Sequence, residues 1–157
     1  GFTVRESAWR TPCHYLVDWA PGEKSRMAKL ARLEASGQVE RAITMAVFML
    51  DIRKAIEIIN RQAINVNNGM SVNFAMLGVT LASMEKRMKQ SAILLRDTCE
   101  KLSQHLTGDY MPALFAFISS DRQDFGRVLA SNILLEDKIL FALRYLSDSR
   151  LTSFINK

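Results

Sequence analysis

The chain has 157 residues, the usual size of one domain, and its 48% hydrophobic and 24% charged residues are typical of a globular protein. Two cysteines exclude a disulfide framework, and the scarcity of glycine (7) and proline (3) favours long helices with short joints. The net charge of +5 comes from basic residues scattered among acidic ones, so it does not by itself predict a nucleic-acid-binding protein.

The first 22 residues lack a helical period and carry prolines at positions 12 and 21. We therefore expect residues 1–22 to form an irregular N-terminal arm, with Trp9 and Trp19 pinning it to the body. Residues 23–157 are expected to form one helical domain, in which apolar residues recur at helical spacing. The first expected helix, from Glu23 to about 36, stops at Gly37.

The following helices are predicted from apolar periodicity and from capping residues. Asp51 is predicted to cap the third helix and Ser71 the fourth, with a loop over 60–70 between them. The fifth begins somewhere within 83–89, on a cluster of charged residues. After the first helix, the expected helices span 38–49, 52–59, 71–82, about 89–106, 112–118, 122–131, 135–146 and 150–156.

Several of these helices are predicted to be buried on more than one side. The runs 45–50 and 113–118 are apolar all round, and 135–146 carries one apolar face with Ile139 and Leu143 and another with Phe141. Helices with two apolar faces need neighbours on both sides. We expect an all-α fold, an α-solenoid of about eight or nine helices stacked as antiparallel pairs, with a closed helical bundle as the alternative.

No catalytic or metal-binding constellation is predicted. Metal-ligand spacings and glycine-rich phosphate loops are absent from the sequence, and Cys13 beside His14 makes a poor ligand pair. Cys99 lies on a helix seam, where a buried structural role is expected. Glu136 and Asp137 start a predicted helix, where carboxylates favour the helix dipole. We therefore expect no enzyme activity, no cofactor and no metal.

Two further features bear on partners and location. Lys24, Arg26, Lys29 and Arg32 share one predicted helix, for which a solvated face is the preferred interpretation and a nucleic-acid-binding face the alternative. The longest uncharged stretch, 62–84, is interrupted by asparagines and is too short in apolar residues for a membrane span. No signal peptide is visible, so a cytosolic location is expected.

Four segments, taken together, resemble a known family. The resemblance runs from about 37 to 157 and is most specific at FMLDIRKAIEIIN, residues 48–60. It is to the α-solenoid region of the Mio (missing oocyte) family, subunits of the GATOR complex, called SEA in yeast. The segments are GQVERAITMA (37–46), VFMLDIRKAIEIIN (47–60), YMPALFAFISS (110–120) and DKILFALRYLSD (137–148).

The resemblance implies a non-enzymatic scaffold domain. In that family the solenoid lies between a WD-repeat β-propeller and a zinc module, and the complex supports amino-acid-dependent target-of-rapamycin signalling at the lysosome or vacuole surface. The implied partners are other GATOR/SEA subunits, including WD-repeat β-propeller proteins, without nucleic acid. An unrelated helical adaptor remains the alternative.

Partner contacts are expected at the two ends of the stack. In a solenoid each helix pair contacts its neighbours, so the first and last pairs each leave an apolar side uncovered. At one end the predicted interface contains Trp9 and Trp19, and at the other Leu151, Phe154 and Ile155.

Overall fold

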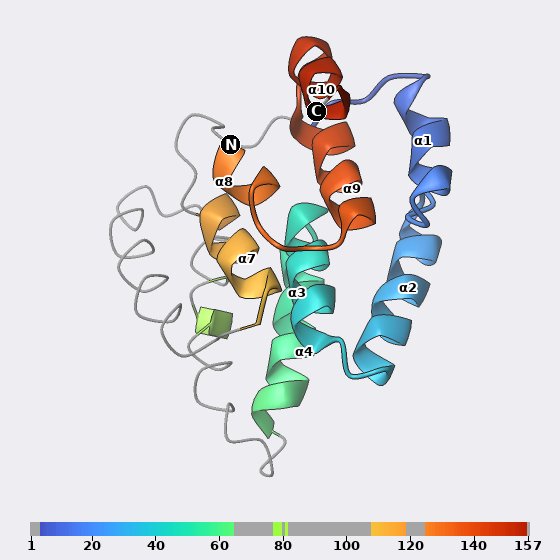
Figure 1. Cartoon of the computed structure of the whole chain (residues 1–157). Helices are drawn as coiled ribbons and strands as arrows, with labels where there is room; N and C mark the ends of the chain where they lie inside the picture. Colours follow the sequence, from blue (N-terminus) through green and yellow to red (C-terminus); the bar gives the residue numbers. More distant parts are fainter. Residues whose placement is uncertain (1–3, 65–76, 80, 82–107, 119–124, 157) are drawn as a thin grey trace.

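The computed structural model describes residues 4–64, 77–79, 81, 108–118 and 125–156, and within these residues every regular element is a helix (Figure 1). The part of the expected fourth helix that is described, 77–79 and 81, is helical. The expected fifth helix, including Cys99, lies outside the described residues. The helices are α1 (Arg10–Leu16), α2 (Glu23–Ala35), α3 (Val39–Phe48), α4 (Ile52–Ile64), α7 (Tyr110–Ile118), α8 (Gly126–Leu129), α9 (Leu135–Tyr145) and α10 (Asp148–Ile155).

Helices α2, α3, α7 and α9 confirm the predicted segments to within one or two residues. Three predictions need correction. Helix α4 continues through Ile64, so the loop expected from residue 60 begins later. Helix α8 is a single turn, shorter than predicted. The arm expected to be irregular contains α1, because Pro12 occupies the third position of that helix, where its missing N–H removes no intrahelical hydrogen bond.

Helices α2 and α3 end in the same hydrogen-bond motif. After α2, Gly37 N–H bonds to Glu34 O and Gln38 N–H to Leu33 O, which is a Schellman motif with the expected glycine at φ 83°. After α3 the same pair of bonds forms, but the left-handed position holds Leu50 at φ 58°. Because no glycine follows α3, the sequence does not indicate this helix end. Asp51 then caps α4 as predicted, since its Oδ1 accepts from Lys54 N–H at 3.2 Å.

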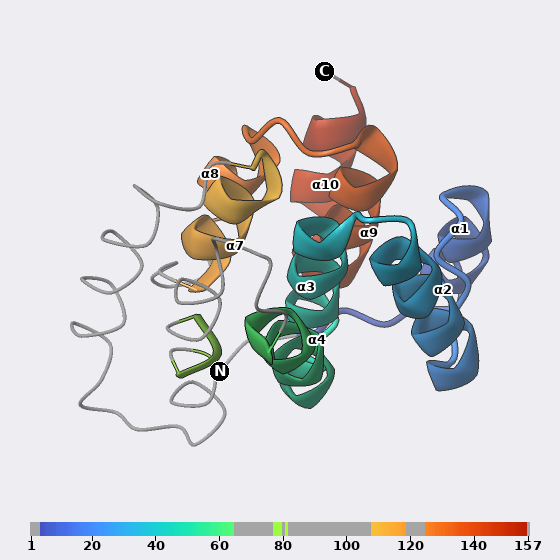
Figure 2. The same cartoon turned by 90° about the horizontal axis from the view of Figure 1, so that it is seen from below.

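The stack turns back on itself. Helix α3 lies between α2 and α4 on one side and α7 on the other, while α9 packs against both α8 and α1 (Figures 1 and 2). The first and last parts of the chain therefore meet. Arg5 N–H donates to Arg144 O at 2.6 Å, and Arg10 bonds to Leu143 O and pairs with Asp148 of α10 at 2.7 Å. The two ends expected to lie apart are therefore in contact through α1 and α9.

The core centres on a cluster of aromatic rings from α3, α7, α8 and α9. Phe141 lies at its middle, with ring centroids 4.8 Å from Phe48, 4.9 Å from Tyr145, 5.2 Å from Phe125 and 5.6 Å from Phe117. Several pairs are edge-to-face, an arrangement that stabilises aromatic contacts beyond their buried area. Residues 113–117 and the Phe141 face of α9 are buried as predicted, whereas Ile118 at the end of the run is half-buried.

Glu40 provides a pH-dependent prediction. Its carboxylate packs on Gly108, where a Cβ would lie 1.5 Å from Glu40 Oε2, and burial together with nearby Asp109 raises the pKa of Glu40. A carboxyl whose pKa is higher in the folded state costs stability once the pH exceeds its unfolded pKa. We expect Glu40→Gln to raise the melting temperature at pH 7 and to lose this advantage at about pH 4. An equal gain at both pH values in thermal melts would contradict this interpretation.

Candidate docking groove and buried carboxylate cluster

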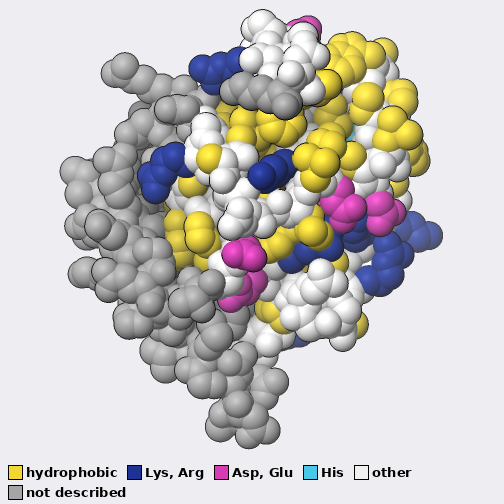
Figure 3. All heavy atoms as spheres, in the orientation of Figure 1, with side chains coloured by type: hydrophobic (Ala, Val, Ile, Leu, Met, Phe, Trp, Pro, Cys, Tyr) yellow, Lys and Arg dark blue, Asp and Glu magenta, His cyan; other side chains and the backbone are white. Residues whose placement is uncertain are grey.

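An apolar groove of about 750 Å³ lies between α8, α9 and α10. We call it the C-terminal groove. Its apolar wall includes Phe125, Leu129, Ile139, Leu146 and Phe154. Figure 3 shows hydrophobic side chains gathered over this part of the molecule, with basic side chains between and beside them. The side chains that line it are Phe125, Gly126, Leu129, Ala130, Leu135, Lys138, Ile139, Leu146, Arg150, Ser153, Phe154 and Ile155.

Helical register explains why the groove exists. In α9, Leu140, Phe141 and Leu143 turn into the core and are at most 3% exposed. Leu135, Lys138 and Ile139 follow a different stripe and line the groove, with Leu135 66% exposed. The second apolar face of α9, predicted from the sequence to need a neighbour, is thus covered in part by α8 and α10. Leu135 was predicted to be part of that packed face, and its exposure corrects this.

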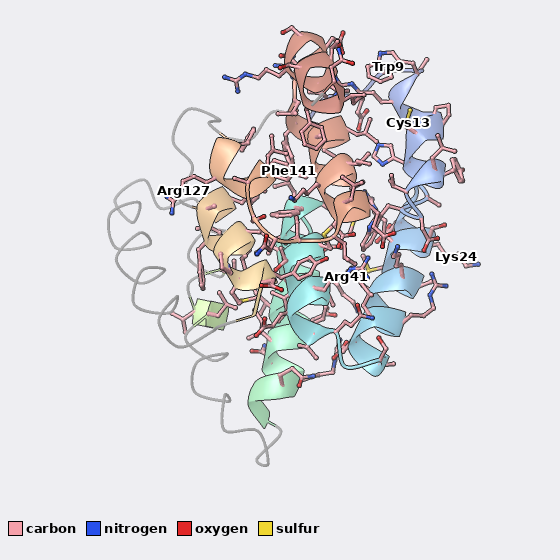
Figure 4. The ribbon with its side chains drawn as sticks, viewed as in Figure 1. Trp9, Cys13, Lys24, Arg41, Arg127 and Phe141 are labelled. Atoms are coloured by element: carbon pink, nitrogen blue, oxygen red, sulfur yellow. The ribbon has the colours of Figure 1, made fainter. Side chains whose placement is uncertain are left out.

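The described charged residues that line the groove are of one sign. Lys138 of α9 and Arg150 of α10 are the charged residues among the described residues that line it. Arg127 of α8, labelled in Figure 4, is exposed on the side of α8 turned away from α9 and does not line the groove. The groove thus combines an apolar floor with positive charge at its edges.

The five residues predicted to contact a partner have different environments. Trp19 and Leu151 are each 2% exposed and pack in the core of the described structure, so a contact with a partner stays a prediction for them. Trp19 does pin the arm, as predicted. Phe154 and Ile155 line the C-terminal groove, and Ile155 is 68% exposed. Trp9 is 48% exposed on α1, away from that groove, with the Arg10 guanidinium 4.9 Å from its ring centroid.

Asp137 is the centre of a buried polar cluster. Its carboxylate is fully buried and accepts from Trp19 Nε1 at 2.8 Å, from Arg41 Nε at 2.8 Å and Nη2 at 3.1 Å, and from the Tyr110 hydroxyl. Burial, together with the hydrogen bond to Asp137, raises the pKa of Tyr110. Arg41, labelled in Figure 4, also pairs with Glu136. One carboxylate therefore joins the arm, α3, α7 and α9 behind the groove wall.

Sequence reasoning missed this cluster. It assigned Asp137 to the first turn of a helix, which is correct, but with the helix dipole as its role. Asp137 lies in a helix whose other face is apolar, and Arg41 begins a run of buried residues in α3. Charged residues inside apolar runs are rarely buried without a partner, and this was the available signal.

The basic helix face also differs from its prediction. Lys29 is 6% exposed, donates to Asp18 O at 2.6 Å and to Asp18 Oδ2 at 3.0 Å, and lies 4.3 Å from the centre of the Trp19 ring. The hydrogen bond from Lys29 and its charge lower the pKa of Asp18. Lys29 is therefore a structural residue of the arm, and the solvated face expected for it is wrong. Arg32 and Lys24 are exposed.

The described residues contain neither a metal-binding cluster nor a membrane-spanning helix. Within the described part of the chain, no three His, Cys, Asp or Glu side chains come close enough together to hold a metal ion. In the same part, none of the helices is both long and apolar enough to cross a bilayer. Cys13 has a free thiol, and its Sγ lies 3.4 Å from Trp9 O.

Helices stacked side by side around a shared core place the domain in the α-solenoid class. Residues 3–145 match the family model for the MIOS α-solenoid, and the chain belongs to that family. The match begins 34 residues before the resemblance found from the sequence, which started at residue 37. This agrees with the presence of α1 in the arm.

Relatives from distant organisms support the assignment. GATOR2 complex protein MIOS of Danio rerio is 33% identical over 129 residues, which cover 82% of the chain and 14% of that relative. The protein of the same name from Dictyostelium discoideum is 25% identical over 183 residues, covering 100% of the chain and 16% of the relative. SEH-associated protein 4 of Saccharomyces cerevisiae is 26% identical over 149 residues, 94% of the chain and 14% of the relative. The chain thus spans about one seventh of these relatives.

Proposed function

We propose that the chain is a non-enzymatic scaffold domain of a GATOR2-type (SEA) complex subunit, cytoplasmic and peripheral at the lysosome or vacuole membrane. Its role is to support amino-acid-dependent target-of-rapamycin signalling by holding other subunits, WD-repeat β-propeller proteins among them. The support for this proposal is the family membership and the names of relatives, which call them GATOR2 complex proteins or, in yeast, an SEH-associated protein.

The observation that carries the proposal is the C-terminal groove. An apolar groove of this size at the junction of three helices is suited to the apolar face of another helix. The basic residues Lys138 and Arg150 at its edges favour acidic residues beside that face. We therefore assign the groove to an amphipathic, acidic helix of another subunit of the complex.

Ile155→Asp tests this assignment. Ile155 is 68% exposed, so the substitution should leave the melting temperature of the chain within a few degrees of the original. It places a carboxylate in the groove and should weaken assembly by at least about tenfold, because the new charge is desolvated on binding. The measurement is the affinity between the full-length protein carrying the substitution and its purified partner subunits. Phe154→Asp should have the same effect on assembly, with a larger cost in stability because Phe154 is half-buried.

Leu16→Asp is the matched control. Leu16 is 85% exposed on α1, so it introduces the same charge on an apolar surface residue outside the groove. Assembly weakened equally by the Leu16 and Ile155 substitutions would overturn the assignment. So would a stable dimer of the chain alone that Ile155→Asp dissociates, because the occupant would then be a second copy.

A further inference from the structure

A second pocket, of about 320 Å³, lies where the N-terminal segment and α1 meet α2 and α9. We call it the arginine pocket. Four arginines line it: Arg5, Arg10, Arg26 and Arg144. Glu6 is the acidic residue among the described residues that line it. The pocket therefore carries an excess of positive charge, although Arg10 is already paired with Asp148.

Two of the four guanidinium groups are fixed in place by the fold. Arg10 is 3% exposed and is held by Leu143 O at 2.6 Å and Asp148 at 2.7 Å. Arg144 donates to the carbonyl oxygens of Phe48 at 3.2 Å and Met49 at 3.3 Å. Carbonyl oxygens orient the Arg144 guanidinium without neutralising its charge, so the wall of the pocket is both positive and rigid.

The other two arginines remain available to a ligand. No ion pair joins the side chain of Arg5 or Arg26 to another described residue, and Arg26 is half-buried at the pocket wall. Arginine presents a planar fork of donors that matches the oxygens of a phosphoryl group in a bidentate arrangement. Glu6 and the Asp148 that pairs with Arg10 leave the four arginines with net positive charge, which such a group would offset.

A buried hydroxyl in the same pocket points to the same chemistry. Ser7 Oγ is buried and has no hydrogen-bond partner. Among the buried side-chain oxygens and nitrogens of the described residues, it alone lacks one. A buried hydroxyl without a partner costs free energy, and a turn of the Ser7 side chain toward the pocket would let Oγ donate to an anionic oxygen there. His14 lines the pocket as well. Burial lowers the pKa of His14, and so do the positive charges of Arg144, Arg26 and Arg10. These three arginines therefore lie close enough together to act on the same imidazole.

We propose that the arginine pocket binds a small phosphorylated anion, with Arg26 and Arg5 contacting the phosphoryl oxygens and Ser7 Oγ donating a hydrogen bond. The pocket is formed by the contact between α1 and α9, so a bound anion ties the beginning of the chain to its end. This binding is independent of the C-terminal groove and of the proposed scaffold function. The shared chemistry is the phosphoryl group, which a soluble metabolite or a lipid headgroup can supply.

The test uses inorganic pyrophosphate as the probe. Titration calorimetry of the chain should detect binding, and the melting temperature should rise with pyrophosphate concentration. Arg26→Gln should weaken the affinity by about tenfold or more, since a charge-assisted hydrogen bond is lost. Lys24→Gln is the matched control, because it removes the same charge from an exposed position on the same helix, outside the pocket. It should change the affinity by less than about twofold.

Ser7→Ala separates binding from folding. Because Ser7 Oγ has no partner to lose, the substitution should not lower the melting temperature of the free chain, yet it should weaken pyrophosphate binding severalfold. Binding that is absent, or equally weakened by the Arg26 and Lys24 substitutions, would overturn the proposal. Binding to phosphatidylcholine vesicles with and without a phosphorylated phosphoinositide shows whether the phosphoryl group comes from a lipid headgroup or from a soluble anion. Binding to the phosphoinositide vesicles that pyrophosphate displaces supports a headgroup, and no vesicle binding supports a soluble anion.

Discussion

Asp137→Ala is expected to lower the free energy of unfolding by about 3–5 kcal/mol, measured by urea denaturation monitored by circular dichroism. The substitution removes the acceptor shared by Trp19, Arg41 and Tyr110, all of which donate to the one buried carboxylate. Arg41 is 8% exposed and would keep a positive charge with only the half-exposed Glu136 beside it. Removing one partner of a buried ion pair leaves the other charge buried without compensation. This lowers stability more than replacing both partners by apolar residues would.

Glu136→Gln is the matched control for this prediction. Glu136 is the next residue along α9 and also pairs with Arg41, but 41% of its side chain is exposed. Solvent screens such a pair, so its loss should cost less than about 1 kcal/mol. If Asp137→Ala cost no more than Glu136→Gln, the buried cluster would not hold the arm to the solenoid.

Phe141→Ala is expected to cost about 3–5 kcal/mol, because it opens a cavity at the centre of the aromatic cluster. Phe141 is fully buried and contacts the rings of Phe48, Phe117, Phe125 and Tyr145. These rings come from α3, α7, α9 and the start of α8, so neighbouring helices cannot all move inward to fill the space. The cost is measured by thermal or urea unfolding.

Phe115 extends the same prediction to α7. It is 6% exposed, and Phe115→Ala should also cost about 3–5 kcal/mol. Leu16→Ala is the control, since Leu16 is 85% exposed and its truncation should stay within about 0.5 kcal/mol. A shift of one or two degrees in the melting temperature for Phe141→Ala would show that the rings can repack around the missing side chain.

The sequence by itself determined most of the described helices and the buried run in α7. The glycine stop at Gly37, the cap at Asp51 and the apolar run in α7 all proved correct. Each is a local signal, because a helix end depends on the residues within one turn of it. The same reasoning failed at Leu50, where the helix ends on a left-handed leucine that no local preference favours.

Only the tertiary structure decided which polar groups are buried and which apolar groups are left uncovered. Asp137 and Arg41 are 96 residues apart, and Lys29 is buried because the arm passes over it and brings Asp18 and Trp19 into contact. The C-terminal groove exists because α8 and α10 leave part of α9 uncovered, and the arginine pocket exists because α1 packs on α9. Periodicity reveals that a face needs a neighbour, but the free energy of burying a charge depends on partners that lie far away in the chain.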